Sequence, residues 1–252
     1  MGKMKDGLKF SLAMAPVSIA AGLCLCIYQL DLYPEEELAL IVEQAGSRGA
    51  LVLIGVGQTL AAVMLASFFG YLLSNAVGLW HARVLEPSAV VRCLLVSAAA
   101  GVLFSLDFWV FGSVLEEVRD SIIPGLTVGG VAAAVLYGGV VEEILMRLFF
   151  MSLMVFLLWK LFFHRRDRQH IPEGVFITAN CLAALVFALG HLPATMLLFG
   201  KLTPLVVFRC LLLNGGFGLL FGRIYRKCGL RCAMLSHATL HLVSKLIWGL
   251  LL

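Results

Sequence analysis

The chain has 252 residues, of which 61% are hydrophobic and 13% are charged, and its formal net charge is +4 at pH 7. A soluble domain is about 45–50% apolar and 25% charged. This composition therefore excludes a soluble globular protein and indicates an integral membrane protein, expected as a single membrane domain over residues 1–252. No basic surface interleaved with aromatic residues points to a nucleic-acid partner.

Seven apolar runs approach or exceed the roughly 20 residues that a spanning helix needs. We therefore expect an all-α transmembrane bundle with about seven crossings. No convincing cleavage site follows the first run, so we expect a retained helix and not a signal peptide. The runs cover residues 10–30, 49–79, 90–111, 125–163, 175–199, 203–224 and 229–252.

The charges between these runs alternate along the chain. Basic loops stay cytoplasmic, so we expect a cytoplasmic N-terminus and an outer C-terminus. Short loops are typical of a prokaryotic inner or plasma membrane protein, which is the expected location. The basic segments are 3–9, 83–92 with Arg83 and Arg92, 160–170 and 223–231, and the other connectors are 31–48, 116–120 and 200–204.

The fourth run is too long for one straight crossing. Residues 125–163 would form a helix of about 58 Å, whereas the hydrocarbon core is roughly 30 Å thick. This helix must tilt, project into the cytoplasm or break into two segments, and the glycine pair 138–139 is the expected bend.

Three charged residues follow that glycine pair. Glu143 and Arg147 are four residues apart, which places them on one face of an α-helix and suits an ion pair. Glu142 lies about 140° around the helix from Arg147. We therefore expect Glu143 to neutralise Arg147, which leaves Glu142 free to face another helix. The alternative is an interhelical salt-bridge network without chemistry.

Three histidines lie in later runs. His191 follows Phe187 by four residues, so that ring is expected to pack against the imidazole. His237, His241 and Lys245 share one face of the last run. The two histidines suit either a metal with a third ligand or hydrogen bonding to an oxyanion, and Lys245 is expected to reach the outer interface.

The sixth run contains Arg209 and Asn214 as candidate substrate-binding residues. Arg209 suits either a substrate carboxylate or an ion pair with Asp107, and the sequence does not choose between them. The nearby glycines are expected to permit close helix packing. These glycines are at positions 215, 216, 218 and 222.

The chain resembles the CPBP family in three motifs that occur in the family's order. These are EExxxR (142–147), FxxxH (187–191) and a histidine four residues before a polar residue (237–241). The family comprises the CaaX-protease and bacteriocin-processing (Abi) intramembrane endopeptidases of the glutamic type. The resemblance covers residues 125–245 and implies a catalytic core there, whereas residues 1–120 contribute helices without motifs.

The resemblance implies a role for each matching residue. Glu142 would activate the hydrolytic water and His191 would orient it, while His237 and His241 would stabilise the oxyanion. Glu143 and Arg147 would hold the site in shape. The chain departs from the family pattern at His241, where asparagine is usual, and at Leu148, where glycine is common.

Two alternatives remain open from the residues alone. One is a zinc-dependent hydrolase that uses the three histidines as ligands, with Glu142 as base. The other is a non-catalytic membrane protein, such as an immunity factor or a partner of another enzyme. For the endopeptidase we expect no cofactor and a peptide or protein substrate that enters from the membrane or the cytoplasmic side. Water is expected to reach Glu142 through a cavity open to the cytoplasm.

Overall fold

A computed structural model describes residues 2–80 and 86–252, so Arg83 lies outside the described residues. Every regular element of this part of the chain is helical, as the sequence predicts. The elements are α1 (Gly2–Leu30), α2 (Glu35–Ala45), α3 (Arg48–Val77), α4 (Pro87–Ser105), α5 (Asp107–Val110), α6 (Glu116–Gly125), α7 (Val128–Ala133), the π-helices η1 (Ala134–Glu142) and η2 (Ile144–Met151), α8 (Ser152–Phe162), the 3-10 turn η3 (Arg168–His170), α9 (Glu173–Gly190), α10 (Leu192–Phe199), α11 (Pro204–Cys228) and α12 (Leu230–Leu251).

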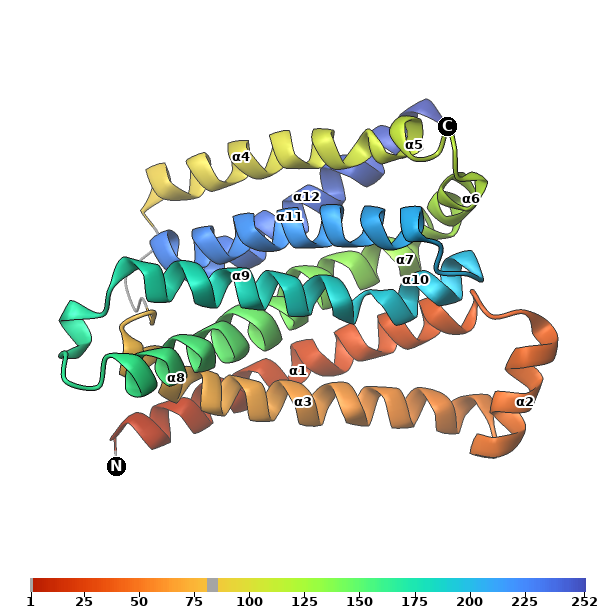
Figure 1. The fold of residues 1–252 in the computed structure, drawn as a ribbon. Coiled ribbons are helices and arrows are strands. Elements are labelled where there is room, and N and C mark those ends of the chain that lie inside the picture. Colours follow the sequence, from red (N-terminus) through yellow and green to blue (C-terminus); the bar gives the residue numbers. More distant parts are fainter. Residues whose placement is uncertain (1, 81–85) are drawn as a thin grey trace.

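The long helices run side by side, and the two termini lie at opposite ends of the bundle (Figure 1). In the described part of the chain, six helical segments are long and apolar enough to cross a membrane. The seventh predicted crossing corresponds to α12, a helix of 22 residues whose sequence also contains Arg231, His237, His241 and Lys245. The short helices α2, α6 and α10 gather at the end with the C-terminus.

The overlong fourth run forms one helical segment, Val128–Phe162, of 35 residues. Figure 1 shows it crossing the bundle obliquely from α7 to α8, so the run tilts and does not break. Its middle is π-helical over η1 and η2. Such segments are rare and often lie at functional sites.

The glycine pair 138–139 lies within η1 and permits close contact with α12. A Cβ atom at Gly139 would lie 2.9 Å from the Cβ of Ala238, and one at Gly138 would lie 3.2 Å from Nε2 of His241. Since neither glycine carries a Cβ, η1 and α12 can approach closely enough to share one site.

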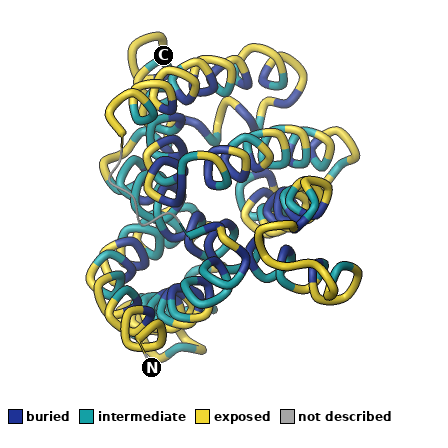
Figure 2. The backbone as a smooth tube through the Cα atoms, turned by 90° about the vertical axis from the view of Figure 1, so that its left-hand side faces the viewer, coloured by how far each residue is buried: buried dark blue, intermediate teal, exposed yellow. Residues whose placement is uncertain are grey.

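Buried residues face the interior of the bundle and exposed residues face outward (Figure 2). Many exposed side chains are large and apolar, such as Leu53, Leu95 and Leu161, as expected for helices that contact lipid. Leu148, which replaces the common glycine of the family motif, is fully buried. A Cβ at Gly70 of α3 would lie 2.9 Å from Cγ of Leu148, so a glycine on the neighbouring helix makes room for this leucine.

Candidate active site

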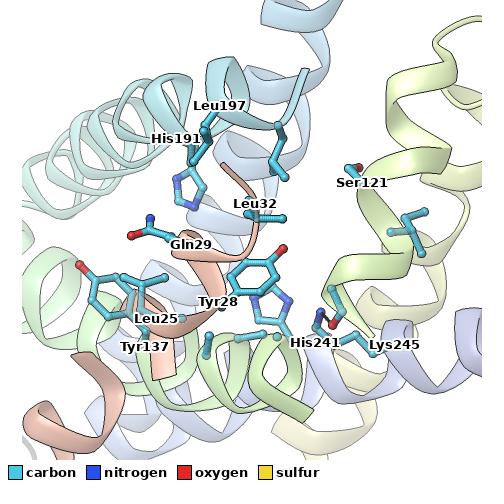
Figure 3. Close-up of a pocket in the computed structure, with 18 of the residues that line it drawn as sticks. Leu25, Tyr28, Gln29, Leu32, Ser121, Tyr137, His191, Leu197, His241 and Lys245 are labelled. Carbon is cyan, nitrogen blue, oxygen red and sulfur yellow. Dashed lines mark hydrogen bonds between the residues drawn. The ribbon is translucent and has the colours of Figure 1, made fainter. Parts of the chain in front are cut away.

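A cavity of about 310 Å³ lies inside the bundle and reaches the predicted site residues. Glu142, His191 and His241 line it. Figure 3 shows His191 and His241 facing this space from different helices. A second cavity of about 500 Å³ also reaches Glu142 and His191, so these two residues stand between the two spaces.

The carboxylate of Glu142 lies between two imidazoles. Its Oε1 is 3.7 Å from Nε2 of His191, and its Oε2 is 3.9 Å from Nε2 of His237. Both distances exceed those of a direct hydrogen bond. Because the Glu142 side chain retains 19% of its exposure, its oxygens can bind a water molecule from the cavity.

Glu143 is fully buried and has two partners. Its Oε1 lies 3.2 Å from Nη1 of Arg147, which confirms the predicted ion pair. The same oxygen lies 2.8 Å from Nδ1 of His237. A carboxylate can only accept a hydrogen bond, so His237 carries a proton on Nδ1. Glu143 therefore also fixes a catalytic candidate, which the sequence prediction did not include.

His237 and His241 lie on the same face of α12, as predicted, and their Nε2 atoms are 3.1 Å apart. When both rings are neutral, Nδ1 of His237 holds its proton, so His241 donates from Nε2 to Nε2 of His237. Phe221 stacks on the ring of His237 at 4.4 Å between centroids. These contacts hold two imidazoles beside Glu142 in defined orientations.

His191 lies where α9 ends and α10 begins, which brings its side chain toward Glu142. Pro193 lies in the first turn of α10, where a missing N–H costs no helical hydrogen bond. The Nδ1 atom of His191 is 2.8 Å from the carbonyl oxygen of Phe187, so this nitrogen donates and Nε2 is free to accept. The Phe187 ring packs edge-on against the imidazole at 4.5 Å, as predicted.

Phe187 also contacts the guanidinium of Arg147, which lies 4.6 Å from the ring centroid. Arg147 donates from Nη2 to the carbonyl oxygen of Gly218 at 3.1 Å. A Cβ at Gly218 would lie 3.2 Å from Ala184, whereas one at Gly216 would meet no atom within 4 Å. Close helix packing therefore requires a glycine at position 218 but not at position 216.

The two candidate substrate-binding residues differ in position. Arg209 lines the 310 Å³ cavity, but its guanidinium forms a bidentate ion pair with Asp107, with Nε 2.7 Å from Oδ1. Its charge is therefore neutralised within the protein. Asn214 donates from Nδ2 to the carbonyl oxygen of Cys210 in its own helix at 3.0 Å and does not line this cavity.

Residues that the sequence analysis did not single out complete the cavity. Tyr28 and Gln29 of α1 and Tyr137 of η1 line it, and Figure 3 shows Gln29 beside His191. Tyr28 and Gln29 lie near the end of an apolar run, where polar side chains are ordinary at a membrane interface, so no motif distinguishes them. The first helix therefore contributes directly to the site.

Lys245 is half-buried and also lines the cavity. Its Nζ donates to the carbonyl oxygen of Gly125 at 2.6 Å, and Figure 3 places it near His241. The ammonium is therefore held by an acceptor within the bundle, and its expected position at the outer interface stays a prediction.

The 310 Å³ cavity extends toward the end of the bundle that carries the C-terminus, where Leu32, Ser121 and Leu198 line it. At the same end, Lys201 lies 2.6 Å from Glu117, and its hydrogen bond lowers the pKa of that carboxyl.

Within residues 2–80 and 86–252, no three His, Cys, Asp or Glu side chains are grouped so as to hold a metal ion.

Residues 124–243 match the family described as Rce1-like, type II CAAX prenyl endopeptidase Rce1-like. A probable G-protein coupled receptor 151 of Rattus norvegicus is 38% identical over 86 residues, which are 32% of this chain and 20% of the receptor. That short match assigns no activity to the chain. No solved structure matches the chain significantly.

Proposed function

From an Rce1-like domain at residues 124–243, we propose that this chain is an intramembrane endopeptidase in which Glu142 activates water to hydrolyse a peptide bond. The substrate is a membrane-associated protein or peptide with a C-terminal sorting or CaaX-like segment. The position of Glu142, on a cavity wall and between the imidazoles of His191 and His237, supports this proposal most strongly.

The proposed reaction begins when the Glu142 carboxylate takes a proton from a water molecule that His191 orients. The resulting hydroxide attacks the carbonyl carbon of the scissile bond, and the negative charge moves to the carbonyl oxygen. The Nε2–H of His241, which is bonded to Nε2 of His237 before the reaction, turns to this oxyanion and donates a hydrogen bond to it. Protonated Glu142 then returns the proton to the leaving amine as the C–N bond breaks.

Glu142→Gln tests the proposed base directly. The amide cannot accept a proton from water, so we expect kcat to fall by about 10²- to 10⁴-fold. Purified protein and an internally quenched peptide ending in a farnesylated cysteine and three aliphatic residues provide the assay. Glu36→Gln, which removes an exposed carboxylate in α2, serves as the matched control and is expected to keep full activity.

Full cleavage by Glu142→Gln would contradict the assignment of Glu142 as the base. An unchanged cellular phenotype of this variant would favour a non-catalytic protein. We propose that the reaction needs no metal. A chelator is therefore expected to leave cleavage unchanged in the same assay. Stoichiometric zinc, with activity lost to a chelator and restored by zinc, would instead support a metal-dependent hydrolase that uses the histidines.

A further inference from the structure

Lys245 is a cation inside the cavity that the proposed hydrolysis does not use. It lies one turn of α12 beyond His241 and lines the same space. Its Nζ has one protein acceptor among the described residues, the carbonyl oxygen of Gly125 at 2.6 Å. An ammonium has three donors, so two remain available to a molecule in the cavity.

No carboxylate of the described residues lies within ion-pairing distance of Lys245. Asp107, which lines the same cavity, already forms an ion pair with the Arg209 guanidinium through both carboxylate oxygens. Lys245 is half-buried, and a cation held within a membrane domain without an anion is costly. The site is therefore complementary to an anion that enters the cavity.

A second donor lies near Lys245. A Cβ at Gly125 would be 3.1 Å from Nζ of Lys245 and 3.9 Å from the hydroxyl oxygen of Tyr28, so both groups lie beside the same glycine. Figure 3 shows Tyr28, His241 and Lys245 around one space. An ammonium with a hydroxyl suits a carboxylate, which accepts several hydrogen bonds.

The spacing along α12 relates this anion site to the reaction. Lys245 follows His237 by eight residues, which is about 12 Å along a helix that rises about 1.5 Å per residue. An extended peptide covers at most about 3.3–3.6 Å per residue. A carboxylate at Lys245 would therefore belong to a chain that ends about three or four residues beyond the bond at Glu142.

We propose that Lys245, assisted by Tyr28, binds the C-terminal carboxylate of the substrate and thereby selects bonds close to a free chain end. This inference rests on the proposed function, because it assigns a specificity residue to the same site. It requires that the enzyme distinguish a terminal acid from a terminal amide, which carries no charge.

The first test measures cleavage of a mixed library of 15-residue peptides prepared as C-terminal acids and as amides, with products identified by mass spectrometry. For wild type we expect cleavage within about four residues of the terminus and a kcat/KM about 10- to 100-fold higher for acids, as a charge-assisted hydrogen bond provides. Lys245→Met should lose this preference, Lys245→Arg should keep it, and Lys201→Met, an exposed lysine outside the cavity, should match wild type.

The second test does not depend on cleavage. Trp248 lines the cavity, so its fluorescence can report binding of N-acetyl-trileucine as acid or amide to Glu142→Gln protein. We expect at least about tenfold tighter binding of the acid, and equal affinities when Lys245→Met is added. Equal affinities in the Glu142→Gln protein with Lys245 intact would overturn the inference.

The two proposals fail in different ways. A wild-type enzyme that cleaves acids and amides equally contradicts the role of Lys245 and leaves the endopeptidase proposal standing. Absence of cleavage, or full cleavage by Glu142→Gln, contradicts the endopeptidase, and with it the substrate role of Lys245. Preference for acids that survives Lys245→Met contradicts the assignment of this residue.

Discussion

Glu143 connects the structural and the chemical parts of the site at the scale of single residues. One oxygen of its carboxylate contacts both Arg147 at 3.2 Å and His237 at 2.8 Å. Arg147 supplies the counter-charge of the Glu143 carboxylate, and this carboxylate accepts a hydrogen bond from Nδ1 of His237. The orientation of the imidazole therefore depends on an arginine that touches neither Glu142 nor the cavity.

Single and double replacement of this pair separate its two roles. Glu143→Leu leaves Arg147 buried without a counter-charge, so we expect the free energy of unfolding to fall by about 3–5 kcal/mol. Glu143→Leu with Arg147→Met removes both charges and should recover most of that loss. Thermal unfolding in detergent measures the stability of each variant.

Catalysis should not recover with stability in the double variant. His237 has lost the acceptor that fixes its ring, so we expect kcat to remain at least about 10- to 100-fold below wild type, as for other outer-shell partners. A double variant with wild-type kcat would show that Glu143 serves only to neutralise Arg147.

At the scale of elements, the contact between η1 and α12 assembles the site. Glu142 is carried by η1, and His237 and His241 are carried by α12. Gly139 has no side chain between them, because a Cβ there would lie 2.9 Å from Ala238. The distance of 3.9 Å between Glu142 and His237 depends on this approach.

Gly139→Ala is expected to push α12 away from η1. Overpacking of this kind costs about 1–3 kcal/mol, and the displaced histidines should lower kcat by more than about tenfold, since misplacement of about 1 Å can cost 10²-fold. Thermal unfolding and the peptide assay measure the two effects. Gly216→Ala is the control, since its Cβ meets no atom within 4 Å, and equal behaviour of the two variants would contradict this account.

Helical spacing predicted the pairing of Glu143 with Arg147 and the packing of Phe187 on His191, because these contacts are local. Contacts between helices could not be read in this way. The hydrogen bond between Glu143 and His237, the contribution of Tyr28 and the inward position of Lys245 depend on how α1, η1 and α12 meet. The π-helical middle of Val128–Phe162 also has no signal in an apolar sequence that suits an α-helix equally well.

At the scale of the whole molecule, the cavity lies toward one end of the bundle. The basic N-terminal segment and the connector 163–172 lie at the opposite end (Figure 1). If basic connectors are cytoplasmic, the cavity extends toward the outer side, which disagrees with the expected opening to the cytoplasm. We propose that the cavity opens toward the outer side, because the four basic segments of the sequence support this orientation.

Single added cysteines test this orientation in intact cells. A membrane-impermeant maleimide should label Glu36→Cys in α2 from outside and should label Arg166→Cys only after the membrane is permeabilised. Peptide mass spectrometry locates the label apart from the native cysteines. The opposite pattern would place the cavity on the cytoplasmic side and would contradict the orientation predicted from charge.

The position of Glu142 on two cavities opens two routes to its carboxylate. One space leads from Glu142 to the end of the bundle, past Ser121 and Leu198. The other leads past Met146 and Val186, between η2 and α9, and is lined mainly by apolar residues. We propose that a lipid-dissolved chain enters sideways along the second route and extends past Glu142 until its end reaches Lys245 in the first cavity, through which water reaches the same carboxylate.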